Sequence, residues 1–279
     1  MMIRGNRTLI KVCVCAFLAL VSFLWIYPFL WMISASFKTT MELFQNGLNL
    51  IPQQISFESY VRAWVKGNFG GYFFNSVFVT VWTIILVVVR CAMAGYVLAL
   101  YDFRGKKIIL AVLMATFLIP TGTTIIPTVE ISQALGLLNT RIGVILALGG
   151  AGNVAALLLY KATFEGVPSS LREAAEIDGA GFMTIFFKVM APLAGPVTAT
   201  TVILTFMGAW NNFMIPLVFT FGTPQFRTLP VGMMAFQGAN ETDWSGMAAA
   251  GTIALVPIVI AFIALQKYFI NGIAGAVKE

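Results

Sequence analysis

The apolar residues of this chain come in six long runs, and this pattern limits its fold more than any other feature. The runs are about 20 to 30 residues long, enough for a helix to cross the hydrocarbon of a bilayer. They lack the two-residue alternation of barrel strands and exceed the ~10 residues that such a strand needs. Because only helices and closed barrels satisfy every backbone group in lipid, we predict an all-α integral membrane protein with six transmembrane helices. The predicted spans are 12–33, about 73–100, 108–129, 142–160, 197–219 and about 247–265.

The composition agrees with lipid as the solvent and argues against an enzyme. Hydrophobic residues make up 59% of the 279 and charged residues 10%, against roughly 25% charged in a soluble domain. The chain has no histidine, which excludes a Ser-His dyad and an H-E-x-x-H zinc site. The three cysteines, Cys13, Cys15 and Cys91, lie inside apolar runs and are interpreted as packing residues. We therefore expect no catalytic residue and no metal site.

The first apolar run could imitate a secretory signal peptide, because Arg4, Arg7 and Lys11 precede it. Its uncharged stretch at 12–33 is longer than a signal core of about 7 to 15 residues, and no small-residue cleavage site follows. We predict an uncleaved first helix. One membrane domain is expected over 12–270, between an N-terminus, 1–11, and a C-terminal tail, 271–279.

Basic residues near the span ends predict the orientation. Eleven fall on one side and five on the other, which places both termini in the cytoplasm. Arg90 lies inside the second run and is left out of the count; it is expected near the cytoplasmic end of that span, with its side chain extending outward. The eleven are Arg4, Arg7, Lys11, Arg104, Lys106, Lys107, Lys161, Arg172, Lys188, Lys267 and Lys278, and the five are Lys38, Arg62, Lys66, Arg141 and Arg227.

The inner loop at about 162–192 is the most informative segment. Pro168 begins a helix signal, and Ser170 with Glu173 forms the S-x-x-E pattern of a capping box. A short helix over 171–177 is expected to end at Asp178-Gly179, because glycine accepts the left-handed turn at a helix C-terminus. A second short helix is expected over 183–189. The loop is therefore predicted to be two short helices joined at a glycine corner.

This loop resembles the EAA motif of ABC importer permeases. Glu173, Ala174 and Ala175 are followed by Asp178, Gly179 and Ala180, and Pro192 closes the pattern. The resemblance implies the type I ABC importer permease fold, with this loop as the cytoplasmic coupling helix that docks into a cleft of an ATPase subunit.

Further segments resemble the shorter, six-span permease of the maltose-type carbohydrate importers, over about 74–278. The resemblance implies a bacterial inner-membrane subunit that imports a sugar or oligosaccharide by alternating access. It implies a second, heterologous permease, two ATPase subunits that use ATP and Mg, and an extracytoplasmic binding protein. This chain lacks a Gly-Lys-Ser/Thr phosphate loop and is expected to bind no cofactor itself. Arg90 departs from the apolar or small residue of the family. The matching segments are Phe74-Asn75-Ser76, Leu135-Gly136-Leu137 with Asn139-Thr140, Trp210-Asn211, Thr228-Leu229-Pro230-Val231-Gly232 and Gly275-Ala276-Val277-Lys278.

Several residues have both a structural and a functional interpretation. Glu173 is either the acid of a capping box or a charge partner for the ATPase. Trp210, Asn211 and Asn212 lie within the predicted fifth span, where polar side chains must find partners. They either join helices or line a pathway, in which an indole face and amides suit a sugar.

Three other functions stay open at this point. A permease for a non-sugar solute such as glycerol phosphate would share every motif above. An intramembrane enzyme is disfavoured because no pair of acids lies inside the spans. An ion-coupled transporter would need ionisable groups near the midplane, where only Arg90 is a candidate.

Overall fold

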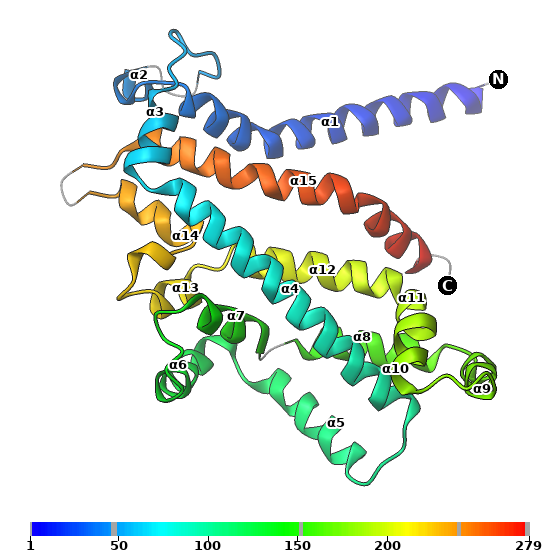
Figure 1. Ribbon diagram of the computed structural model, residues 1–279. Helices are drawn as coiled ribbons and strands as arrows, with labels where there is room; N and C mark the ends of the chain where they lie inside the picture. The colour runs from blue at the N-terminus through cyan, green and yellow to red at the C-terminus, as the bar shows by residue number, and fades with distance from the viewer. Residues whose placement is uncertain (1, 46–48, 151–152, 239–240, 277–279) are drawn as a thin grey trace. The chain divides into compact units, whose positions relative to one another are not determined.

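The computed structural model describes residues 2–45, 49–150, 153–238 and 241–276, and this part of the chain is helical apart from one antiparallel bridge between Gln237 and Thr242 (Figure 1). The short turns are π-helical at Arg62–Lys66 and Phe186–Met190 and 3-10 at Thr116–Leu118, Thr121–Thr124, Pro224–Phe226 and Met233–Phe236. The helices are α1 (Met2–Ser36), α2 (Thr40–Gln45), α3 (Glu58–Val61), α4 (Phe69–Leu100), α5 (Lys106–Ala115), α6 (Ile125–Ala134), α7 (Arg141–Gly150), α8 (Val154–Glu165), α9 (Ser169–Ile177), α10 (Phe182–Ile185), α11 (Ala191–Leu193), α12 (Gly195–Trp210), α13 (Met214–Phe219), α14 (Leu229–Gly232) and α15 (Trp244–Ala276).

Three helices are individually long and apolar enough to cross a membrane, and they confirm the predicted first, second and sixth spans. The segments that qualify are Ile10–Ser36 of α1, Phe69–Leu100 of α4 and Trp244–Ala264 of α15. The first two helices start before the predicted runs, α1 at Met2 and α4 at Phe69. With three bent pairs of shorter helices, the described residues provide up to six candidate spans.

The predicted third span at 108–129 is not one straight helix. Its two halves, Lys106–Leu118 and Gly122–Ala134, meet at an angle of 103°. The break falls at Pro120, which has no N–H to donate and forces Ile119 into an extended conformation at φ −88° and ψ 116°.

The predicted boundaries of the fifth span, 197–219, are also wrong. Helix α12 ends at Trp210, and the candidate span instead pairs Phe182–Leu193 with Gly195–Trp210 at a bend of 79°. Side-chain amides compete with the helix here: Asn212 Oδ1 accepts from the Ile215 N–H at 3.1 Å. The fourth span consists of α7 and α8, bent by 56°.

The chain divides into two compact units, of which the first comprises Met1–Gly70 and Met233–Val256. Its loop after α1 is held by buried polar contacts. Lys38 is fully buried and donates to the Asn49 carbonyl, while the Ser36 and Tyr60 hydroxyls lie 2.7 Å apart. Helix α3 and the π-helical turn that follows it form a short helical segment after this loop.

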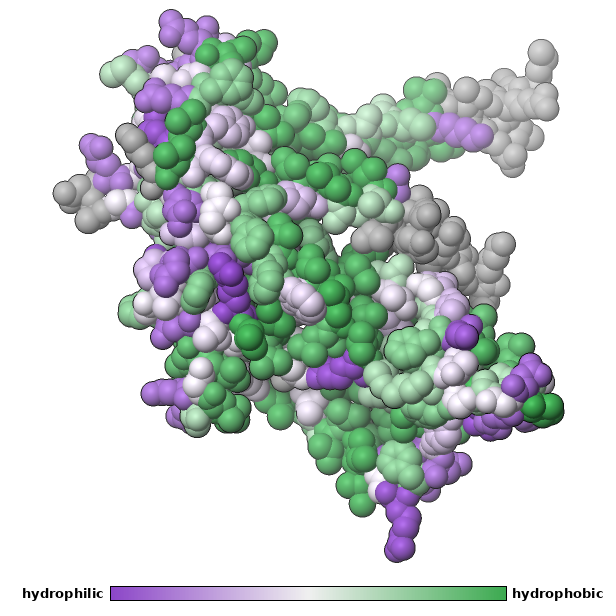
Figure 2. All heavy atoms as spheres, viewed as in Figure 1, coloured by the Kyte–Doolittle hydropathy of each residue, from purple (hydrophilic) through white to green (hydrophobic). Residues whose placement is uncertain are grey.

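The second unit comprises Gly71–Gly232 and Pro257–Glu279. Within it α4 packs through two apolar clusters, one around Val87 and Tyr96 and the other around Val79 and Phe219. In Figure 2 green hydrophobic atoms cover much of this unit, and purple hydrophilic atoms gather over α9 and the turn before α5. That separation is what a unit needs if its middle lies in lipid and the α9 end lies in water.

Candidate functional site

The predicted glycine corner is present in the inner loop, directly after α9. Gly179 has φ +77°, in the left-handed region. Its N–H donates to the Glu176 carbonyl at 3.0 Å, and the Ala180 N–H donates to the Ala175 carbonyl at 2.9 Å. These two bonds form a Schellman motif, which satisfies the last carbonyls of the helix and fixes where it ends. The prediction of two short helices joined at this corner is confirmed.

The predicted capping box is wrong. The cap residue of α9 is Pro168, which makes no side-chain cap hydrogen bond. Helix α9 begins two residues earlier than expected, so Ser170 is its second residue. Pro168 has φ −56° and ψ 132°, and the fixed ring starts the helix without a side-chain acceptor. Glu173 is therefore not part of a capping box.

The corner and the adjoining face of α9 are exposed. Glu173, Ala174, Asp178 and Gly179 all lie at the surface, whereas Ala175 and Ala180 are half-buried against the apolar cluster around Val87 and Tyr96. Ile177, which the sequence did not single out, is 86% exposed at the end of the helix.

An aromatic cluster lies beneath this loop and joins it to the C-terminal end of α4. The Tyr96 ring contacts Phe182, Phe186 and Phe164 at centroid distances of 5.1, 5.3 and 5.9 Å. Tyr101 packs against Phe182 at 5.5 Å. Such tilted and edge-to-face pairs add to the burial of apolar area. The loop therefore rests on a rigid base.

Arg172 adds a polar connection between α9 and α4. Its Nη1 donates to the Leu100 carbonyl at 3.2 Å, and its guanidinium lies 5.9 Å from the Tyr101 ring centroid. Its Nε lies 3.4 Å from Glu176 on the next turn of α9. The Leu100 carbonyl belongs to the last residue of α4, where a carbonyl has no partner within the helix. Arg172 is thus a site residue that the sequence did not identify, because its partner lies 72 residues away.

The three candidate pathway residues lie together at the end of α12. Trp210 is 4% exposed, stacked 5.6 Å from Phe206 and edge-on 6.1 Å from Phe73. Asn211 is exposed, and its Nδ2 donates to the Met207 carbonyl at 3.1 Å. Asn212 is half-buried and holds the start of α13, as described above. Of the three, Asn211 presents a polar side chain to the surface.

The comparison with protein families decides the identity of the chain. Residues 91–275, well over half of its length, match the family described as "Binding-protein-dependent transport system inner membrane component". The chain belongs to this family. It is a multi-pass inner-membrane permease of an ABC transporter, a transport subunit and not an enzyme.

Individual relatives of this permease match it over nearly its full length. The probable ABC transporter permease YurM of Bacillus subtilis is 36% identical over 253 residues, 90% of this chain and 83% of that protein. The diacetylchitobiose uptake permease NgcG of Streptomyces coelicolor is 36% identical over 266 residues, 95% and 86% of the two chains. The arabinooligosaccharide permease AraQ of Halalkalibacterium halodurans is 34% identical over 264 residues, 93% and 94%.

A solved bacterial ABC transporter involved in the import of the acidic polysaccharide alginate contains a chain of the same fold. The TM-score is 0.82 at 24% identity, over 95% of this chain and 98% of that one. At this identity the likeness concerns the fold alone, and it confirms the predicted all-α ABC importer permease fold.

The geometry explains why separate segments of the permease carry the family resemblance. Asn75 Nδ2 donates to the carbonyls of Gln225 and Arg227 at 2.8 and 2.9 Å, and Arg141 Nε donates to Asn75 Oδ1 at 2.8 Å. Ser76 Oγ accepts from the Leu229 N–H at 2.8 Å. The start of α4 therefore holds the loop before α14. The motif at 275–278 lies partly outside the described residues.

The first unit of the permease contains an ion pair that the sequence did not reveal. Arg62 donates from Nε and Nη2 to the two carboxylate oxygens of Asp243, both at 3.2 Å. Asp243 Oδ1 also accepts from the Gly246 N–H at 2.9 Å and thus caps α15. Partial burial acts to raise the pKa of Asp243, but the hydrogen bond and charge of Arg62 and the Gly246 N–H outweigh it and hold this pKa below 3.8.

Proposed function

We propose that this permease carries a sugar or oligosaccharide into the cytoplasm, together with a second, heterologous permease subunit and two ATPase subunits. NgcG and AraQ, which match it over more than nine-tenths of its length, are named for diacetylchitobiose and arabinooligosaccharides. An extracytoplasmic binding protein delivers the solute, in keeping with the family description. ATP and Mg belong to the ATPase subunits in this proposal, and the permease holds neither.

The observation that carries this proposal is the exposed glycine corner of α9 on its aromatic base. We assign Glu173, Ala174, Ala175, Asp178, Gly179 and Ala180 to ATPase coupling. The corner presents no side chain at Gly179, and apart from its two chain neighbours no described residue lies within 4 Å of the position that a Cβ would take there. That open space allows a partner to approach the backbone closely.

The contacts around α9 indicate how ATPase motion reaches the spans. Arg172 and the Tyr96 cluster connect the loop with the end of α4. From there the Tyr160 hydroxyl of α8 donates to Thr198 Oγ1 of α12 at 2.9 Å. When the ATPase dimer closes on ATP, displacement of α9 moves α4, α8 and α12 together. Hydrolysis releases α9 and resets the pathway.

We place the solute pathway beside the end of α12. Asn211 contributes a surface amide, which suits sugar hydroxyls, and Asn212 shapes the break that follows. Trp210 borders the pathway and is held by Phe206 and Phe73 rather than presenting its whole indole face.

The decisive experiment is purification of the permease from its own membrane followed by reconstitution. A second permease and an ATPase should accompany it, and uptake of labelled oligosaccharide should require ATP and the binding protein. Uptake of glycerol phosphate but of no sugar would show that the proposed solute is wrong and would leave the proposed ATP-driven transport in place. Activity of the solitary chain without an ATPase would overturn the proposal.

A further inference from the structure

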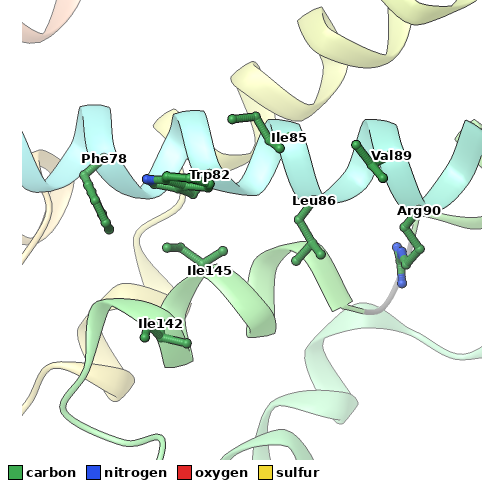
Figure 3. Close-up of a pocket in the computed structure, with 8 residues that line it drawn as sticks. All are labelled: Phe78, Trp82, Ile85, Leu86, Val89, Arg90, Ile142 and Ile145. Carbon is green, nitrogen blue, oxygen red and sulfur yellow. The ribbon is translucent and has the colours of Figure 1, made fainter. Parts of the chain in front are cut away.

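A groove in the second unit takes no part in the coupling described above. It encloses about 530 Å³ between α4 and α7, and two isoleucines of α7 form one wall (Figure 3). Figure 3 shows the α4 side chains following one another along the length of the helix. These side chains are Phe78, Trp82, Ile85, Leu86, Val89 and Arg90.

The groove has the length and polarity of one lipid chain. Phe78 and Arg90 are twelve residues apart, or about 18 Å along a helix. One leaflet contributes half of the ~30 Å hydrocarbon thickness, about 15 Å. The lining is hydrocarbon and aromatic over this distance, and the single charged side chain stands at one end.

Arg90 is a cation with an incomplete set of partners. The sequence predicted that this side chain extends outward from the span, and in the structure its Nη1 donates to the carbonyl of Gly150, the last residue of α7 (Figure 3). Its Nε is buried and has no hydrogen-bond partner among the described residues. No carboxylate of the described part of the chain forms an ion pair with it. Charged side chains inside spans pair with opposite charges or with backbone carbonyls, and beside the Gly150 carbonyl an anion would complete the partners of this guanidinium.

We propose that this groove binds one acyl chain of an anionic phospholipid, whose phosphate pairs with Arg90. The planar guanidinium matches phosphate oxygens in geometry and charge. A helix of a second permease subunit would cover apolar side chains but would not by itself neutralise the cation. The inference is independent of which solute the permease carries.

The test uses the importer complex purified from its membrane and placed in phosphatidylcholine nanodiscs. These contain a small fraction of phosphatidylglycerol with a photoreactive group on one acyl chain. After illumination, the label should map to the α4 peptide that contains Phe78 to Arg90. Arg90→Gln should lower this labelling about tenfold, as expected for the loss of a charge-assisted contact, and Arg90→Lys should retain most of it.

Two further variants separate the groove from general effects. Val89→Trp fills the groove and keeps the charge, so labelling should fall although Arg90 is intact. Lys107→Gln removes an exposed charge from the first turn of α5 and should leave labelling unchanged. If Arg90→Gln fails to fold, the labelling of Val89→Trp and the labelled position in the wild-type permease still test the proposal.

Three results would overturn the proposal. The first is equal labelling of the α4 peptide by photoreactive phosphatidylcholine. The second is wild-type labelling found only outside α4 and α7. The third is a disulfide or cross-link from a cysteine at Ile85 to a span of the second permease, which would show a protein helix in the groove.

Discussion

At the scale of single residues, this permease depends on a few side chains that bind backbone or side-chain groups far away in the sequence. Asn75, Arg141, Arg172 and Arg62 each contact a partner 66 or more residues distant. In lipid or at its edge, polar groups have little water available for hydrogen bonds. The contacts of these side chains within the protein therefore specify how the elements pack together. Single substitutions at these positions are therefore expected to have effects that their exposure alone would not indicate.

Gly179→Val should disrupt the corner after α9. A β-branched residue resists the left-handed conformation by about 1–2 kcal/mol, and its side chain would occupy the open space where the ATPase is proposed to approach. Co-purified ATPase and sugar-stimulated ATP hydrolysis should fall together by tenfold or more, a loss of about 1.4 kcal/mol.

Gly181→Val is the matched control for that substitution. Around Gly181, too, no described residue apart from its chain neighbours lies within 4 Å of the position of a Cβ, but its φ of −77° suits any residue. The control should keep most of the ATPase. If Gly179→Val retained full sugar-coupled turnover, α9 would not be the coupling element.

The Arg62–Asp243 pair should make stability depend on pH. Because the pKa of Asp243 is lowered in the folded chain, its contribution is present above pH 4 and is lost as the pH falls through the folded pKa below 3.8. Asp243→Asn should lower the free energy of unfolding by about 1 kcal/mol at pH 7 and by progressively less below pH 4. Thermal unfolding of the two proteins in detergent, at pH 7 and below pH 4, measures this difference in stability. The exposed neighbour Glu241 is the control, since Glu241→Gln should shift neither curve; an equal shift for the two variants would refute the prediction.

At the scale of elements, the sequence predicted the coupling loop well and the broken spans poorly. Gly179 indicated the end of α9 because the left-handed turn there depends only on residues that are neighbours in the sequence. The 103° break at Pro120 and the end of α12 at Trp210 lie inside continuous apolar runs, where hydropathy is the same on both sides. A proline or an asparagine in such a run is compatible with a kink, a break or a continuous helix, and neighbouring helices decide among them.

Arg172 should matter for transmission and not for attachment of the ATPase. Arg172→Gln removes the guanidinium that joins α9 to the Leu100 carbonyl and to Glu176. The ATPase should still co-purify, while sugar uptake per ATP hydrolysed falls about tenfold, within the range of coupling changes seen for residues between two sites. The control is Lys107→Gln, which removes another basic side chain on the predicted cytoplasmic side. Unchanged uptake per ATP in Arg172→Gln would show that the Tyr96 cluster suffices.

Trp210 and Asn211 should respond differently, because one is buried and the other exposed. Trp210→Ala leaves a cavity beside Phe206 and should destabilise the chain by about 3–5 kcal/mol, lowering its amount in the membrane. Asn211→Ala should leave that amount unchanged and reduce oligosaccharide uptake several-fold. Quantitative blotting beside uptake distinguishes them. Normal uptake in Asn211→Ala would remove this residue from the pathway.

At the scale of the whole molecule, orientation connects the sequence to the mechanism. The bias of eleven basic residues against five predicts that both termini and α9 lie in the cytoplasm. The ATPase is cytosolic in the proposed function, so the coupling corner can work only in that orientation. Topology is therefore a test of the mechanism as well as of the charge rule.

Single-cysteine labelling measures this orientation directly. Cys13, Cys15 and Cys91 are first replaced, and a cysteine is then placed at Glu241, before α15, or at the exposed Lys107, in the first turn of α5. A membrane-impermeant maleimide should label Glu241→Cys in intact cells and Lys107→Cys only after permeabilisation. If the two cysteines react from opposite sides of the membrane, an odd number of spans separates the two sites. The reverse pattern would place α9 outside the cell, where no ATPase can reach it, and would refute the orientation and the coupling role together.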